Sequence, residues 1–147
     1  MAYQNAYVKT VIQVLHDGER GFADIGEHLK SLELKLYFVQ EAQTRGSFAR
    51  ELEAEYGTTT GESQDIGGTA SGTIHRIWGD LKGNLGGSDH TLMETAEQGE
   101  DAAKKAYEAA LNDTSISGAM RSILTKQQSH IQVSHDKVKA FRDQVTK

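Results

Sequence analysis

The residues of this chain best suited to chemistry are carboxylates and histidines spaced along helix-forming segments. A dinuclear metal site in a helical bundle needs a carboxylate from each of two helices and a Glu-x-x-His pair from each of the other two. Glu41 is followed by Thr44 where the histidine would stand, and His135 is preceded by Gln132 where the glutamate would stand. Each pair therefore lacks one member, and the chain holds no complete di-metal motif.

Counting residues outward from the predicted helix–helix turns indicates which polar side chains share a level. Glu19 and Arg45 lie about equally far from the first turn, and Glu100 and Gln128 about equally far from the second. A guanidinium at this level would repel a metal ion, and it would supply the charge partner that buried carboxylates require. We therefore predict a structural polar layer made by Glu19, Arg45, Glu100 and Gln128.

Two alternatives stay open for these side chains. In the first, Glu19, Glu41, Glu100 and His135 bind iron or manganese, ions that take carboxylate and imidazole ligands. In the second, the polar side chains face solvent and have no special role. A histidine such as His135 is also typical of a hydrogen-bonded position at the edge of a core.

Composition excludes several classes of protein. The net charge of −5 disfavours nucleic-acid binding, which depends on clustered lysine and arginine. With no cysteine, the chain forms neither disulfides nor thiolate metal sites, and a cytoplasmic location is expected. It has no uninterrupted apolar run near 18 residues and no charged-then-apolar leader, so we expect neither membrane spanning nor export.

The elements that must position the polar side chains are long helices. The 147 residues, expected to form one domain over 1–147, include no proline, and the glycines gather between Gly57 and Gly87. Helical spacing of apolar residues predicts long helices over about 5–30, 31–56, 88–112 and 117–145, and a shorter one over about 71–85. The first helix carries an apolar stripe in alternating steps of three and four: Val8, Val11, Leu15, Gly18, Phe22, Ile25 and Leu29.

Short turns join the long helices in two pairs, so each pair should be an antiparallel hairpin. About 30 residues, 57–87, connect the hairpins, which is enough to return the chain along a helix of roughly 37 Å. The sequence therefore predicts an all-α protein, a four-helix bundle with ferritin-like connectivity whose long crossover carries a short helix.

Several short motifs, spread over nearly the whole chain, support this fold by resemblance. They are Asp17-Gly18-x-x-Gly21-Phe22, Gln43-x-Arg45-x-x-Phe48-x-x-Glu51-Leu52, His75-Arg76-x-Trp78-x-Asp80-Leu81-Lys82, Glu97-x-Gly99-Glu100-Asp101-x-Ala103-x-x-x-Tyr107, and Gln128 with His135-Asp136. With them the chain resembles the uncharacterised bacterial ferritin-like four-helix-bundle family, whose members are labelled a domain of unknown function. The resemblance implies a fold and no reaction.

We accordingly expect a non-enzymatic helical bundle that acts as a binding or structural module, with no cofactor. A protein partner or self-association would fit such a module, and the general character of ferritin relatives suggests a role in stress. The alternative is a divergent carboxylate bundle that binds iron or manganese.

Overall fold

The computed structural model describes residues 6–60 and 72–145, with the side chains of 58–60 and 72–75 left aside. These residues form five α-helices and no strand, so the chain is an all-helical bundle, as the sequence predicted. The helices are α1 (Ala6–His28), α2 (Leu32–Thr60), α3 (Gly72–Asn84), α4 (Asp89–Leu111) and α5 (Gly118–Gln144). No helix in the described ranges is long and apolar enough to cross a membrane.

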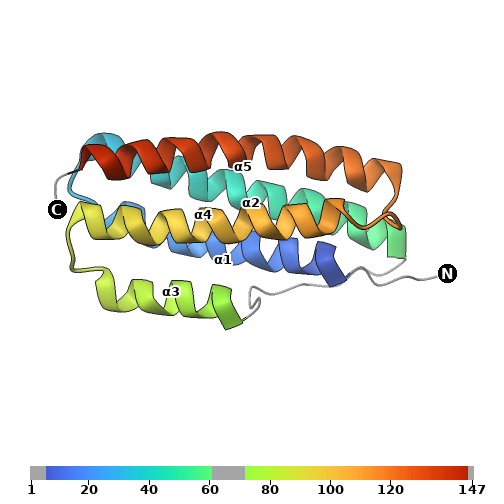
Figure 1. Ribbon diagram of the computed structural model, residues 1–147, viewed down its shortest axis with the longest axis horizontal. Coiled ribbons are helices and arrows are strands. Elements are labelled where there is room, and N and C mark those ends of the chain that lie inside the picture. Colours follow the sequence, from blue (N-terminus) through green and yellow to red (C-terminus); the bar gives the residue numbers. More distant parts are fainter. Residues whose placement is uncertain (1–5, 61–71, 146–147) are drawn as a thin grey trace.

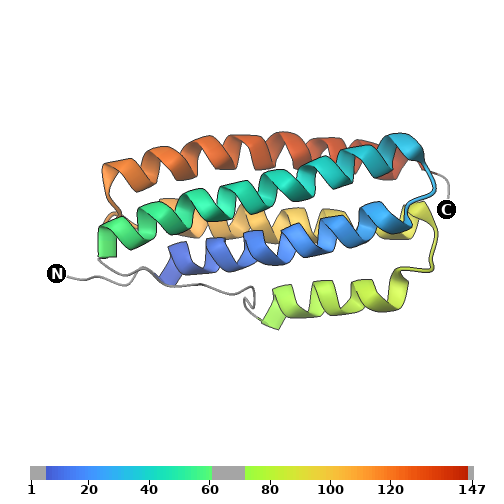
Figure 2. The ribbon, with the colours of Figure 1, turned by 180° about the vertical axis from the view of Figure 1, so that it is seen from behind.

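The four long helices lie side by side, and each has two long neighbours (Figures 1 and 2). α1 packs against α2 and α4, and α5 packs against α4 and α2. α1 and α2 are antiparallel, as are α4 and α5, whereas α2 and α4 run in the same direction. The shorter α3 lies outside this square and packs on α1 and α4. α2 continues through Gly57 to Thr60, beyond the expected end near residue 56, because one glycine weakens a helix by only about 1 kcal/mol and does not have to end it.

Side chains fix the ends of the helices. Ser88 and Ser117 are the N-caps of α4 and α5, where each hydroxyl accepts a backbone N–H of the first turn. Asp89 reaches across to the other hairpin and accepts the backbone N–H groups of Lys30 and Ser31, at 2.9 and 3.1 Å. The turn between α1 and α2 is thereby fastened to the start of α4.

The apolar interior is divided into two clusters along the bundle. The predicted stripe of α1 is buried along its whole length, and its members enter both clusters. One cluster includes Leu15, Leu52, Tyr107 and Leu124, and the other includes Phe22, Phe38, Leu92 and Val138. Between Leu15 and Phe22 the stripe holds Gly18, and it is at this level that polar side chains enter the bundle.

Trp78 anchors α3 to the bundle in a notch made by two glycines. A methyl group on Gly21 of α1 would lie closer than 3.0 Å to three ring atoms of Trp78, and one on Gly99 of α4 would lie 2.6 Å from the same indole. The indole also meets the ring of Phe22 edge to face, with centroids 5.8 Å apart. The two glycines are therefore required by the close approach of the indole, which explains why α1 and α4 carry glycine at these positions.

Candidate functional site

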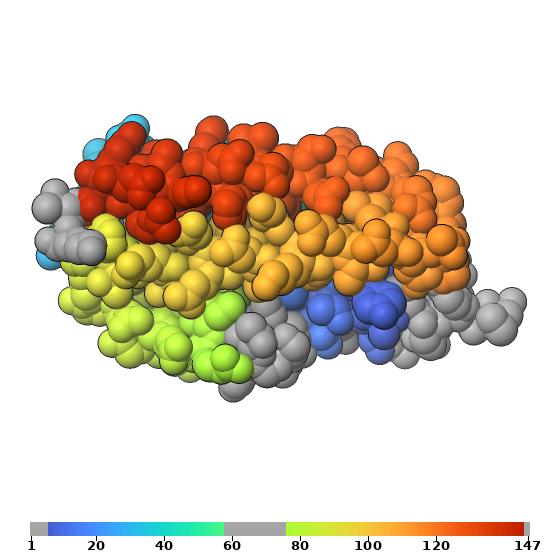
Figure 3. Space-filling model, viewed as in Figure 1, coloured from blue at the N-terminus to red at the C-terminus, as the bar shows by residue number. Residues whose placement is uncertain are grey.

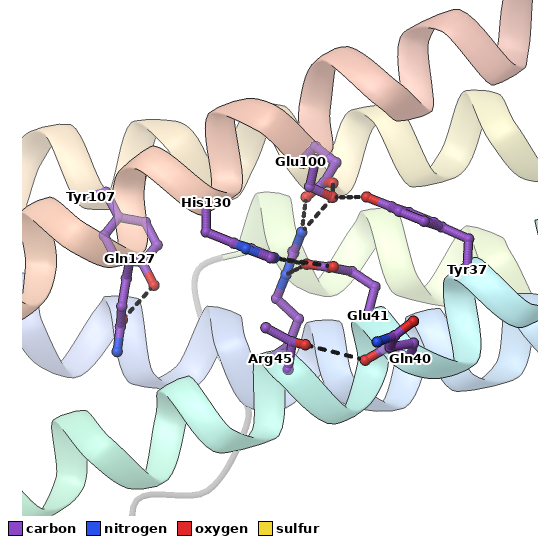
Figure 4. Close-up of polar contacts among 10 residues, drawn as sticks. Tyr37, Gln40, Glu41, Arg45, Glu100, Tyr107, Gln127 and His130 are labelled. Atoms are coloured by element: carbon purple, nitrogen blue, oxygen red, sulfur yellow. Dashed lines mark hydrogen bonds and ion pairs between the residues drawn. The ribbon is translucent and has the colours of Figure 1, made fainter.

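A buried arginine is the centre of the polar layer (Figure 4). Arg45 projects from α2 into the bundle, where its Nε donates to Glu41 Oε2 at 2.8 Å. Its Nη2 lies 2.6 Å from Glu100 Oε1 of α4, and the side chains of both partners are almost fully buried. On its other side the guanidinium covers the ring of Phe22 at 4.6 Å. Arg45 therefore joins carboxylates from two helices while it stacks on a third.

Ser134 of α5 completes the layer. Its hydroxyl donates to Glu100 Oε2 at 2.5 Å and accepts from Tyr37 at 2.8 Å and from Arg45 Nη2 at 3.1 Å. The hydroxyl thus uses its donor and both acceptor positions. Glu100 Oε1 has no hydrogen-bond partner of normal geometry, so its stabilisation comes from the charge of the guanidinium 2.6 Å away.

His130 connects the layer to solvent. Its Nε2 lies 2.9 and 3.1 Å from the two oxygens of Glu41, and its side chain is 40% exposed. The ring also meets Phe48 edge to face. From His130 a continuous line of contacts runs through Glu41, Arg45 and Glu100, which places every charged group of the layer next to an opposite or neutral partner.

Burial and neighbouring charges shift the pKa values of Glu100, Arg45 and Tyr37. Burial raises the pKa of Glu100, and the neighbouring Arg45 and Ser134 offset part of that rise. Burial would lower the pKa of Arg45, but Glu100 and Glu41 outweigh it, so that the guanidinium pKa is raised and its charge is permanent. Burial also raises the pKa of Tyr37 to about 12, so this phenol remains a hydrogen-bond donor at neutral pH.

The structure separates the four residues predicted for the polar layer. Arg45 and Glu100 are in contact, as described above. Glu19 has turned toward α2, where its carboxylate occupies the space beside Gly46 and makes no ion pair with Arg45. Gln128 is half-buried, and its neighbour Gln127 is the inward residue, which accepts from Tyr107 at 2.7 Å and donates to Glu51 at 2.9 Å. Arg45 and Glu100 lie at one level, but the α5 side chain that meets them is Ser134 and not Gln128.

The four predicted metal ligands are not brought together either. Glu41 and Glu100 both bind Arg45, which leaves the guanidinium where a shared cation would have to sit. Glu19 packs beside Gly46, and His135 lies in contact with Asp101, with 2.8 Å between Nε2 and Oδ1. The donor set therefore does not fit a dinuclear metal centre, because its central position is already filled by a positive charge.

A different group of ligand-type atoms lies between α4 and α5. Among the described residues, Glu97, Asp101 and His135 form a cluster whose ligand atoms are within 4.8 Å of one another. Each is already engaged: Arg142 binds Glu97, and the two ring nitrogens of His135 face Asp101 and Asp136. All three side chains therefore already have polar partners within the protein.

Sequence reasoning missed three members of the layer, Tyr37, His130 and Ser134. Ser134 could have been found, because it continues the three-and-four spacing of Gln127, Ile131 and Val138 along α5. Tyr37 and His130 lie at the border between α2 and α5, where periodicity alone does not separate an inward from an outward side chain.

The comparisons with known proteins give a family without an activity. The family model described as "Domain of unknown function (DUF2383)" matches residues 6–113, which include α1 to α4 and the notch of Trp78. A search of curated proteins found no match.

Proposed function

The chain belongs to the DUF2383 family of unknown function, and from that premise we propose that it is a non-enzymatic module for binding or structural support, built as a ferritin-like four-helix bundle. The observation that carries the proposal is the position of Arg45. It lies between carboxylates of α2 and α4 and binds both, in the interior position where a carboxylate bundle would hold a cation.

The arrangement of the layer supports a structural role over a catalytic one. A catalytic carboxylate needs access to a substrate, whereas Glu100 is fully buried and Ser134 and Arg45 cover it. Ser134 is saturated with hydrogen bonds, and the pKa of Tyr37 is raised rather than lowered, so neither is an activated nucleophile or base. What the layer can do is fix the relative positions of α2, α4 and α5.

The path of the chain supports the ferritin-like connectivity. In ferritin-like bundles a long crossover joins two hairpins, and the two helices it joins run in the same direction. α2 and α4 have this relation here (Figure 1). We place the module in the cytoplasm because the sequence has no cysteine, and we expect its partner to be a protein or a second copy of the chain.

Elemental analysis tests the proposal directly. Protein purified without chelator should contain iron or manganese well below one equivalent, and EDTA should leave its melting temperature unchanged. The matched control is Glu100→Gln, which removes the carboxylate but keeps its shape. A stoichiometric transition metal that is lost in Glu100→Gln would overturn the proposal and favour a divergent metal-binding bundle.

A further inference from the structure

A groove lies where α3 meets α1 and α4, away from the polar layer. Its volume is about 680 Å³, within the range of small-molecule sites in proteins. α3 is much shorter than the long helices, and it lies beside only part of the length of α4 (Figure 3). The notch of Trp78 holds α3 in place, so this wall of the groove has a fixed position.

Part of the groove lining is apolar, beside polar residues that include Thr10 and Gln98. Val14 from α1, Ile77 from α3, and Ala102 and Ala106 from α4 form the apolar part. Val14 and Ile77 are buried in the protein, and the two alanines are half-buried. Small side chains on α4 leave room beside α3, so the surface offered to a ligand favours a hydrocarbon or aromatic body.

Two cations stand at the groove, one on each of two helices. Arg76 of α3 and Lys105 of α4 are exposed, and neither forms an ion pair with another residue that the structure describes. Asp101 precedes Lys105 by one helical turn, but it binds His135 at 2.8 Å instead. Asp80 is the one carboxylate of the lining that has no such partner within the described residues. The four charged side chains of the lining sum to a formal charge of zero, but the Asp101 carboxylate already contacts His135, whereas both cations lack an ion-pair partner among the described residues.

We propose that this groove binds a small organic monoanion with an apolar body. The body lies against Val14, Ile77 and the alanines of α4, and the anionic head lies between Arg76 and Lys105. Two cations beside two carboxylates favour a monoanion over a dianion such as a phosphate monoester, because Asp80 and Asp101 would repel the second negative charge. This inference uses no residue of the polar layer and does not depend on the proposed function.

The test uses the fluorescent anion 8-anilinonaphthalene-1-sulfonate as the probe, with octanoate and the uncharged octanamide as competitors. Octanoate should displace the probe at lower concentration than octanamide, and higher salt should reduce that preference. Arg76→Gln and Lys105→Gln should each weaken probe binding about three- to fivefold, and together about tenfold. The matched control is Lys126→Gln, which removes an exposed lysine of α5 outside the groove and should leave binding unchanged.

A second variant tests the body of the ligand separately from its charge. Ala106→Phe fills the groove from α4 and should abolish saturable probe binding, while thermal melting checks that the variant is folded. Equal binding by wild type and the Arg76→Gln/Lys105→Gln double variant would overturn the proposal. So would unchanged binding by a folded Ala106→Phe, or loss of binding in Leu36→Gln, which alters an exposed apolar residue of α2 far from the groove lining.

Discussion

At the scale of single residues, Arg45 has the largest consequences. A buried ion pair gains little over an apolar pair of the same shape, but removal of one partner leaves the other charge buried and unpaired. Arg45 has two such partners, Glu41 and Glu100, so its loss affects both at once. Arg45 also stacks on the ring of Phe22, and a smaller side chain at position 45 would lose this contact too.

Arg45→Ala should lower the free energy of unfolding by about 3–5 kcal/mol, because Glu100 keeps its burial and loses its counter-charge. Urea unfolding at pH 7 measures the loss. Arg50→Ala is the control, since Arg50 is exposed on the same helix and its removal should change stability by less than about 0.5 kcal/mol. Equal unfolding midpoints for the two variants would contradict the central role of Arg45.

The loss of unfolding free energy in Arg45→Ala should also depend on pH. The pKa of Glu100 is already raised by burial, and without Arg45 it must rise further. A carboxyl with a raised pKa binds its proton more tightly in the folded state, so stability falls as pH rises above the unfolded value. Urea unfolding between pH 4.5 and 8 should therefore show the gap between wild type and Arg45→Ala widening toward high pH. A gap that is constant across this range would mean that Glu100 is not the residue left unpaired.

At the scale of elements, α3 is held on the bundle by the fit of the Trp78 indole against Gly21 and Gly99. Its indole fits the bundle only where α1 and α4 present glycine, and the residues on either side of these glycines are ordinary helix formers. The Trp78 ring then contacts Phe22, and the guanidinium of Arg45 lies over the same Phe22 ring. The attachment of α3 and the polar layer are therefore neighbours in one packed unit.

Gly21→Ala should destabilise the protein by about 1–3 kcal/mol, although alanine is the better helix former. Its methyl group would overlap the rigid indole, so the Trp78 ring must move outward and its fluorescence should shift to the red. Thermal melting and emission spectra measure both effects. Gly79→Ala is the control within α3: a methyl group there meets nothing within 4 Å, so stability should stay the same or rise by up to about 1 kcal/mol. A Gly21→Ala protein as stable as Gly79→Ala would show that the notch does not hold the helix.

At the scale of the whole molecule, the polar layer separates two apolar clusters that would otherwise be continuous. Leu15 and Phe22 lie on opposite sides of it along the same stripe of α1. A layer whose partners come from α2, α4 and α5 can be satisfied in only one relative position of these helices. We therefore assign it the role of fixing the positions of the helices along the bundle axis rather than of adding stability.

This role predicts a contrast between removing one charge and removing all three. The triple variant Glu41→Leu/Arg45→Met/Glu100→Leu should be as stable as wild type or more stable by about 1–4 kcal/mol, whereas Arg45→Ala alone is destabilised. Urea unfolding compares the three proteins. Tyr37 still donates to Ser134 in the triple variant, and the Ser134 O–H, which loses Glu100 as its acceptor, can donate instead to a backbone carbonyl of the preceding turn of α5. A folded triple variant that is clearly less stable than wild type would show that the ionic layer itself contributes net stability.

The sequence by itself determined the helices, the stripe of α1 and the presence of a charged layer at the level of Arg45. These follow from local periodicity, from the absence of proline and from the need of a buried guanidinium for a carboxylate. Only the tertiary structure decided which carboxylates pair with the Arg45 guanidinium. One residue along a helix turns a side chain by about 100°, so a predicted level does not give direction: Glu41 binds Arg45 in place of Glu19, and the α5 side chain that meets Arg45 is Ser134 and not Gln128. The notch of Trp78 likewise depended on the meeting of three helices, because Gly21 and Gly99 stand far apart in sequence and act as one site only when α1 and α4 are packed together.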